Sequence, residues 1–441
     1  MRLSTTKGRL LLLGMLLATG AQAQSFDKGI DKADTTWVLV ASVLVLLMTP
    51  ALAFFYGGLV SVKNVLSTMM HSIVLMGVGS IIWVLLGFTL AFGTSQGWIG
   101  GFDFLYGQNI STSSGLTGMT VPIAAFMLFQ MKFAIITPAL ISGAVAERMK
   151  FSGYVVFTAL WSILIYAPIA CWVWNPGGWL NKLGVLDFAG GSVVHLASGV
   201  AALAACMALG PRKRPGTTPH NVPFVLLGGG LLWVGWIGFN AGSALSVGPV
   251  AASAFISTQV AGAAGLIGWC LLETFTRGKP SAVGAACGLV AGLATITPAA
   301  GYVEPGPAIL IGFASSIVCG LAVNLKTKFR YDDALDVVGV HGAGGFLGML
   351  FTGIFATTAV NELAVKPALA GGRGHLVLIQ LLADVVVLAF SFIGSYLLMK
   401  LTQMVVGVRV PPEHEAAGLD ISLHGESAYV LVHEEEQEAR M

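Results

Sequence analysis

Two stretches of the chain place a histidine within an apolar run that is rich in small residues. The first is Leu186-Asp187-Phe188-Ala189-Gly190-Gly191-Ser192-Val193-Val194-His195-Leu196-Ala197, and the second is Leu335-Asp336-Val337-Val338-Gly339-Val340-His341-Gly342-Ala343-Gly344-Gly345. A Leu-Asp pair precedes each histidine. Ionisable side chains are costly inside a lipid bilayer, so a histidine within a membrane-spanning helix marks a functional position by default.

The composition around these stretches is that of a polytopic membrane protein. Only 23 basic and 21 acidic side chains occur among 441 residues, whereas 56% of the residues are hydrophobic. The charged fraction is 10%, against about 25% in ordinary soluble domains. This excludes a water-soluble surface, and the high hydrophobicity excludes a disordered chain. The net charge of +2 leaves nothing to hold a nucleic-acid backbone.

Small residues predict a tightly packed helix bundle. The chain has 57 glycines, and small residues let helix backbones approach closely in lipid, where no hydrophobic force drives one helix onto another. The five cysteines lie in apolar stretches without metal-binding spacing, and we expect them to be packing residues: Cys171, Cys206, Cys270, Cys287 and Cys319.

Residues 1–23 have the pattern of a secretory signal peptide. Arg2, Lys7 and Arg9 precede a short apolar run, and Ala21-Gln22-Ala23 forms a small-residue cleavage site. The apolar run is far shorter than the roughly 20 residues of a membrane span, which favours a cleaved signal over an uncleaved first helix. The mature chain then begins outside, near Gln24.

Eleven apolar segments of spanning length follow, at about 37–61, 71–93, 121–147, 151–173, 190–210, 223–243, 251–274, 281–299, 306–326, 337–357 and 376–406. Lys and Arg accumulate in cytoplasmic loops of membrane proteins. Eleven spans that begin outside must end inside, and the loops then assigned to the inside hold most of the basic residues: Lys63, Arg148, Lys150, Arg212, Lys213, Arg214, Arg277, Lys279, Lys326, Lys328 and Arg330. The outer loops hold only Lys28, Lys32, Lys182, Lys366 and Arg373. We expect a multi-pass protein of a bacterial inner (plasma) membrane, with its N-terminus outside and its C-terminus in the cytoplasm.

The spans divide into two halves and one extra helix. We expect a transmembrane domain over residues 24–410, with halves at about 37–210 and 223–357 and an eleventh helix at about 376–406. Acidic residues dominate the following segment, 411–441, which predicts a cytoplasmic tail. Leu419-Asp420 and Ala428-Tyr429 are the parts of this tail that we expect to dock on the domain.

The two histidines occupy matching positions, because His195 falls in the fifth span and His341 in the tenth. Halves of five helices run in opposite directions, and inverted repeats place a functional site near the bilayer midplane at their interface. The predicted fold is therefore an all-α membrane protein of eleven transmembrane helices, with inverted five-helix repeats plus an appended eleventh helix. We expect the two histidines to meet; the alternative is two unrelated core histidines bonded to backbone carbonyls.

A pair of neutral imidazoles in an apolar passage has a limited chemistry. Each ring offers one donor and one acceptor without a fixed charge. Two histidines without a third ligand leave zinc under-coordinated, and the sequence contains no HExxH motif. The pattern favours passage of a small, polar, neutral molecule rather than a metal centre or a stable cation site.

Several longer motifs resemble those of the ammonium transporter (Amt/MEP/Rh) family, over about residues 37–430. They are Asp187-Phe188-Ala189-Gly190-Gly191 with His195, Gly235-Trp236-Ile237-Gly238-Phe239-Asn240-Ala241-Gly242-Ser243-Ala244, Gly278-Lys279-Pro280-Ser281, and Asp336 through His341-Gly342. Gly418-Leu419-Asp420, His424-Gly425-Glu426 and Ala428-Tyr429 in the tail also match.

The resemblance implies a transporter rather than an enzyme, with one pore in each subunit of a homotrimer and no cofactor. It implies recruitment of ammonium, or its analogue methylammonium, at an outer aromatic site, deprotonation, conduction of ammonia and separate proton translocation. The matching positions are Phe129, Trp174 and Ser243 for recruitment, Phe133 and Phe239 for a gate, His195 and His341 for the pore and proton relay, and Asp187 for support of the outer site. Surrounding membrane lipid and a PII-type signalling protein at the cytoplasmic face are the further partners that it implies.

Each position also has a purely structural interpretation. Phe129 and Phe133 lie four residues apart on one helix face, where apolar residues usually pack. Trp174 could belong to an interfacial aromatic belt. Asp187 could cap the fifth helix, and we favour this role over direct cation binding.

Two intramembrane charges depart from the expected pattern. We expect Lys132, next to the proposed gate, to extend outward or to lie in a subunit contact, and a subunit interface is one place where Asp384 could find a partner. Two other functions compete with transport. A membrane-embedded hydrolase lacks a recognisable nucleophile or metal motif, and an ammonium sensor on the same scaffold would need a signalling partner beyond this short tail.

Overall fold

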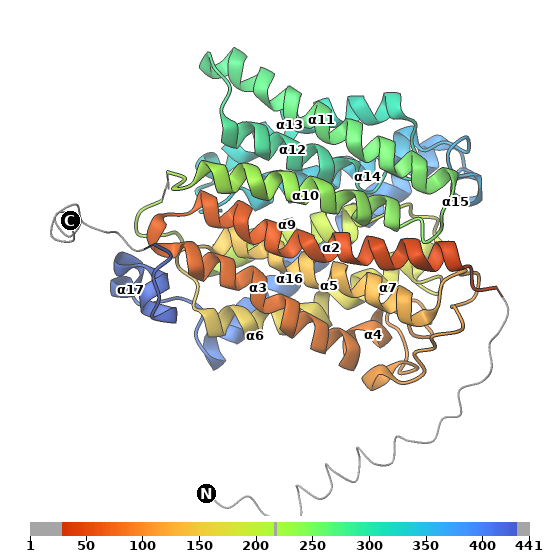
Figure 1. Cartoon of the computed structure of the whole chain (residues 1–441), viewed down its shortest axis with the longest axis horizontal. Coiled ribbons are helices and arrows are strands. Elements are labelled where there is room, and N and C mark those ends of the chain that lie inside the picture. Colours follow the sequence, from red (N-terminus) through yellow and green to blue (C-terminus); the bar gives the residue numbers. More distant parts are fainter. Residues whose placement is uncertain (1–28, 216–217, 430–441) are drawn as a thin grey trace, which may run out of the picture.

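The computed structural model describes residues 29–215 and 218–429, so the predicted signal peptide and residues 430–441 of the tail lie outside the described residues. Long helices lie side by side along the length of the molecule (Figure 1). Across the described ranges the chain forms helices and loops without a strand, apart from two isolated bridges. The all-α prediction is confirmed.

The first half of the chain forms α2 (Lys32–Leu59), η1 (Val62–Asn64), α3 (Val65–Ile82), η2 (Trp83–Gly87), α4 (Phe88–Phe92), η3 (Leu105–Gly107), α5 (Ile123–Val145), α6 (Phe151–Trp161), η4 (Ser162–Tyr166), α7 (Ala167–Trp174), α8 (Trp179–Lys182), η5 (Gly191–Leu196) and α9 (Ala197–Leu209). The second half forms α10 (Val222–Gly242), α11 (Pro249–Arg277), α12 (Ala282–Ile296), α13 (Pro305–Phe329), η6 (Val338–Gly342) and α14 (Ala343–Phe355). The remaining elements are α15 (Glu362–Ala368), α16 (Arg373–Val405), α17 (Pro412–Ala417) and η7 (Asp420–His424).

Among the described residues, ten helical segments are long and apolar enough to cross a membrane. They correspond to ten of the eleven predicted spans. The exception is the predicted span 281–299, where α12 has only 15 residues, fewer than the roughly 20 that cross a bilayer. This short helix still packs on both α11 and α13. The chain is thus a multi-pass membrane protein, whose described residues form ten long apolar helices and one shorter apolar helix, α12.

Loops that were predicted to lie on the inner side meet at one end of the bundle. The Arg148 guanidinium donates hydrogen bonds to the carbonyls of Gly210 (2.9 Å) and Asp332 (2.5 Å). Arg212 forms ion pairs with Glu147 (2.7 Å) and Asp332 (2.8 Å). The tail helix α17 lies at this end, and α15 lies at the opposite end (Figure 1).

The predicted docking of the tail is observed. The Asp420 carboxylate accepts hydrogen bonds from the amides of Leu66 (3.1 Å) and Ser67 (2.8 Å), so a tail residue caps the start of α3. Further along, the Tyr429 hydroxyl lies 3.0 Å from Nε2 of His220. The described part of the tail is therefore held against the domain.

A contact between two glycines brings the halves of the protein together. A Cβ atom on Gly199 of α9 would lie 2.2 Å from the backbone nitrogen of Gly342 at the end of η6. Only a residue without a side chain allows this approach. Because Gly199 follows His195 by one helical turn and Gly342 directly follows His341, the contact sets the separation of the two histidines.

We predict that Gly199→Ala lowers the thermal unfolding temperature of the purified protein, because overpacking at a backbone contact costs about 1–3 kcal/mol. Gly230→Ala is the matched control, since nothing lies within 4 Å of a Cβ atom there and alanine favours helix. Equal unfolding temperatures for the Gly199→Ala variant and the unmodified protein would contradict the proposed contact.

Candidate functional site

The helix that carries His195 begins inside the protein. Its first turn, η5, is a wide π-helical turn of buried residues, and the first amides of a helix have no partner within the helix itself. The Asp187 carboxylate accepts hydrogen bonds from the amides of Gly190 (2.8 Å), Gly191 (2.6 Å), Ser192 (2.8 Å) and Val193 (3.2 Å), and from the Ser192 hydroxyl (2.7 Å). Asp187 is therefore a helix cap, which is the structural role that we favoured from the sequence.

The helix that carries His341 also begins with a π-helical turn, η6, and an acidic cap. Here the cap is Asp333, whose Oδ2 accepts a hydrogen bond from the Val338 amide (2.7 Å). The sequence shows a Leu-Asp pair before each histidine, but the aspartate of the second pair, Asp336, forms an ion pair with Lys326 and does not cap the helix. The equal spacing could have revealed Asp333, since each capping aspartate precedes its histidine by eight residues.

The two histidines meet, as predicted. Nδ1 of His195 lies 3.2 Å from Nδ1 of His341, and their rings are nearly parallel with centroids 5.3 Å apart. A hydrogen bond between two Nδ1 atoms requires one ring to donate and the other to accept, so the two neutral rings must be in different tautomers. The His195 ring also stacks on Trp236 at 5.3 Å, and its Nε2 has no partner among the described residues.

Both histidines line one narrow cavity, in which about 20 Å³ is open to the centre of a water-sized molecule. Its lining consists of Met48, Leu52, Phe55, Tyr56, Ile136, Leu140, Val194, His195, Leu232, Trp236, Phe239, Val290 and His341. These residues include no carboxylate and no lysine or arginine. An ion that entered this space without its water would therefore meet no opposite charge.

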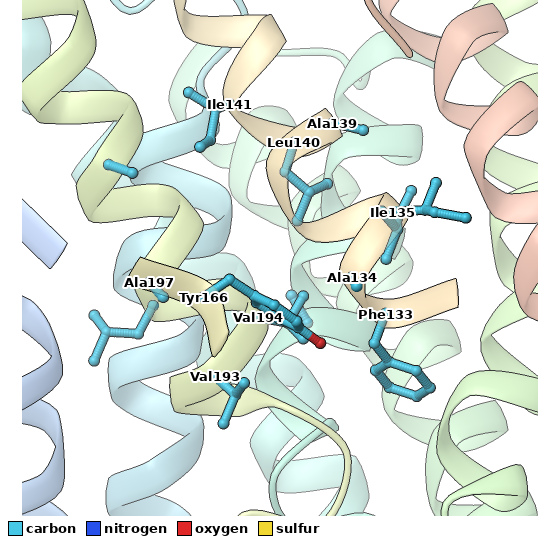
Figure 2. Packing of buried hydrophobic residues seen from close by; sticks show 14 of the residues in the cluster. Phe133, Ala134, Ile135, Ala139, Leu140, Ile141, Tyr166, Val193, Val194 and Ala197 are labelled. Carbon is cyan, nitrogen blue, oxygen red and sulfur yellow. The ribbon is translucent and has the colours of Figure 1, made fainter. Parts of the chain in front are cut away.

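Aromatic rings close the cavity at Phe239. The rings of Phe133 and Phe239 stack with centroids 4.2 Å apart, and both side chains are buried. Phe133 belongs to α5, which lies across from Val193, Val194 and Ala197 of η5 and α9 (Figure 2). The predicted gate pair is thus in contact, directly beside the histidines.

The residues predicted for recruitment gather beyond this stack. Phe129 and Trp174 each contact Phe133, with ring centroids 5.0 and 5.7 Å apart, and the Trp174 indole donates to the Asp187 carbonyl (2.9 Å). Ser243 is the C-cap that directly follows α10, and its hydroxyl donates to the Phe239 carbonyl (2.8 Å). The lone pairs of that hydroxyl oxygen are therefore available to accept a hydrogen bond.

Both unusual charges are buried within the protomer. Lys132 is buried, with Met131 Sδ at 3.8 Å from its Nζ, so it does not extend outward. Asp384 is fully buried within the protomer, and neither carboxylate oxygen has a hydrogen-bond partner among the described residues. A partner across a subunit interface is thereby excluded for Asp384. Across residues 29–215 and 218–429, no cluster of three or more His, Cys, Asp and Glu side chains could hold a metal ion.

Comparison with known proteins places the chain in a family. Residues 36–429 match the Ammonium Transporter Family. The chain belongs to the ammonium transporter family. It is 48% identical over 398 residues to an ammonium transporter of Bacillus subtilis, covering 90% of this chain and 98% of the relative. It is 40% identical to the ammonium transporter Amt1 of Archaeoglobus fulgidus, covering 90% of this chain and 99% of the relative. Members of the ammonium transporter family are transporters or channels and not enzymes.

Solved structures agree with this membership. The chain is similar to Saccharomyces cerevisiae Mep2, with a TM-score of 0.80, 36% identity, and coverage of 88% of this chain and 89% of Mep2. It is also similar to a protein described as a sensor Amt protein, with a TM-score of 0.82, 32% identity, and coverage of 89% and 98% of the two chains. The ammonium transporter fold is therefore shown, and both transporters and a sensor share it.

The Asp333 cap predicts a pH-dependent stability. Burial, together with the nearby Asp336 carboxylate, raises the pKa of Asp333 to about 6. The folded protein then binds this proton more tightly than the unfolded chain, whose ordinary pKa is about 4. Stability from this group is greatest below pH 4 and falls as the pH rises to about 6. Asparagine cannot ionise, so we expect the unfolding temperature of Asp333→Asn to rise relative to that of the unmodified protein as the pH increases from about 4 to about 6. If the difference between the two unfolding temperatures stays constant over this range, the raised pKa of Asp333 is contradicted.

Proposed function

We propose that the chain conducts ammonia derived from external ammonium through the cavity lined by His195 and His341. The observation that carries this proposal is an apolar cavity without fixed charge, closed by stacked phenylalanines and containing two hydrogen-bonded imidazoles. Transfer of an isolated charge into such surroundings costs up to tens of kcal/mol. A cation such as potassium cannot avoid that cost, whereas ammonium can by giving up a proton.

The first step takes place outside the Phe133–Phe239 stack. Phe129 and Trp174 offer ring faces, which attract a cation by about 0.5–2 kcal/mol, and Ser243 Oγ accepts a hydrogen bond from ammonium. Potassium and sodium are also attracted to ring faces, so this site concentrates cations more than it selects among them. Selection comes from the apolar cavity beyond it.

The second step is deprotonation near the stack, followed by passage of ammonia along the imidazoles. The pKa of ammonium is close to that of a lysine side chain, about 10.4, so loss of the proton is uphill near neutral pH. The complementary tautomers of His195 and His341 let the pair hold and pass a proton, because one Nδ1 donates while the other accepts. We include them in a proton relay that operates beside ammonia conduction, with reprotonation at the inner end.

The assembly and its surroundings form part of the same proposal. We place the protein in a bacterial inner membrane as a homotrimer, with the mature N-terminus outside, the 411–441 tail inside and membrane lipid around the bundle. A PII-type signalling protein is the regulatory partner that we propose at the inner face. The docked tail, with Asp420 on α3 and Tyr429 on His220, is the surface at which such regulation would act.

Solid-supported-membrane electrophysiology on purified protein tests the relay. We expect ammonium pulses to elicit a current that sodium and potassium pulses do not, and we expect His195→Ala to abolish it. His375→Ala is the matched control, because His375 is exposed in the first turn of α16 and does not line the cavity. An unchanged current in His195→Ala would reject the relay, and a potassium current as large as the ammonium current would reject selection by deprotonation.

A sensor is the second candidate, because a sensor Amt protein shares this fold. Transport is better supported, since the curated relatives are named ammonium transporters. Uptake of labelled methylammonium into reconstituted vesicles separates the two. We expect saturable uptake that excess ammonium inhibits; binding of methylammonium without uptake would favour the sensor.

A further inference from the structure

One carboxylate at the outer end of α2 joins two segments that are distant in sequence. Asp34 lies in the first turn of α2 and is 9% exposed. Its Oδ1 accepts a hydrogen bond from the Val247 amide (2.7 Å), and its Oδ2 accepts one from the Thr120 hydroxyl (2.5 Å). Each oxygen therefore holds a different segment.

These two segments lead to two walls of the proposed recruitment site, one formed by α5 and one by the end of α10. Thr120 lies just before α5, which carries Phe129, and Val247 follows Ser243 by four residues in the loop after α10. Hydrogen bonds to a charged acceptor are stronger than those between neutral groups. Asp34 is thus placed to fix both walls to the same turn of α2.

Neighbouring hydrogen bonds also attach the start of α2 to each of the two walls. We refer to Asp34 and these contacts together as the clamp. The Asp31 amide donates to the Thr120 carbonyl (2.8 Å), which holds the segment before α5. The Trp37 indole donates to the Ala241 carbonyl (3.2 Å), which holds the end of α10. The first turns of α2 therefore contact both walls through backbone and side-chain groups.

The two walls are closely packed against each other. A Cβ atom on Gly242, the residue before Ser243, would lie 2.6 Å from Cβ of Ala41 and 2.9 Å from the Phe129 ring. Phe129, α2 and the end of α10 are thus in contact at one point. A small movement of either wall changes the distance between the Phe129 ring and the Ser243 hydroxyl.

We propose that Asp34 is a positioning residue for ammonium recruitment: its carboxylate sets the separation of the α5 wall and the α10 wall, so that ring and hydroxyl engage one cation together. This inference rests on the proposed function of Phe129 and Ser243 as a recruitment site. Asp34 acts through Thr120 and Val247 and does not itself contact the cation.

A variant pair at Thr120 separates positioning from charge. Thr120→Val removes the hydroxyl that binds Asp34 but keeps the carboxylate and nearly the same side-chain volume. Thr120→Ser keeps both the hydroxyl and the carboxylate. If Asp34 acted only by attracting cations through its charge, the two variants would behave alike.

The test is the concentration dependence of methylammonium uptake in vesicles, with thermal unfolding of each variant measured alongside. For Thr120→Val we expect the half-saturating concentration to rise roughly threefold to tenfold, as for the loss of one hydrogen bond, with the maximal rate within about twofold of the unmodified protein. Thr120→Ser should match the unmodified protein, and Asp34→Ala should exceed the effect of Thr120→Val. An unchanged half-saturating concentration in Thr120→Val, even with a lowered unfolding temperature, would overturn the inference, as would a loss confined to the maximal rate.

Ser243→Ala distinguishes failure of the clamp from failure of the recruitment site. If Ser243→Ala raises the half-saturating concentration while Thr120→Val does not, the site stands and the clamp is rejected. If Ser243→Ala has no effect on the half-saturating concentration, the recruitment site is rejected, and the role of Asp34 is rejected with it.

Discussion

Both histidine-bearing helices begin inside the protein, and this is the constraint on which the rest of the structure depends. A helix start leaves backbone amides without partners, and neither lipid nor an apolar core supplies water to bind them. Asp187 satisfies four amides at the start of η5, and Asp333 satisfies one at the start of η6. These buried acids allow the chain to place each imidazole deep in the bundle while keeping the cavity itself free of carboxylates.

Close backbone contact between the two histidine-bearing helices then brings their imidazoles together in one site. The approach of Gly199 to Gly342 lets the imidazoles lie within hydrogen-bond distance. Stacking of His195 on Trp236, and of Phe133 on Phe239, surrounds the pair with aromatic surface. In such surroundings a neutral molecule that can donate and accept hydrogen bonds has an advantage over an ion, and we attribute selection to this difference in desolvation cost.

Charged groups serve different purposes in different parts of the molecule. At the end of the bundle that the sequence predicts to face the cytoplasm, Arg148, Arg212 and Asp332 join loops to one another, and Asp420 fixes the tail to α3. At the opposite end, Asp34 joins the segment before α5 to the loop after α10. Nothing in the structure explains the fully buried Asp384.

The sequence by itself determined the membrane class, ten of the long helices, the aromatic and histidine positions, and the family, because hydropathy, residue spacing and extended motifs are local properties of the chain. It predicted a span at 281–299, whereas α12 ends at Ile296 after 15 residues, because an apolar run does not reveal where a turn ends the helix. It did not identify Asp333 as the cap of the His341 helix, because residue context cannot show which carboxylate reaches a free amide. The contact of Gly199 with Gly342, the complementary histidine tautomers and the joining of Thr120 to Val247 through Asp34 were decided only by the tertiary structure. Each of these depends on the distance between residues that are remote in sequence, and that distance is set by how the helices pack.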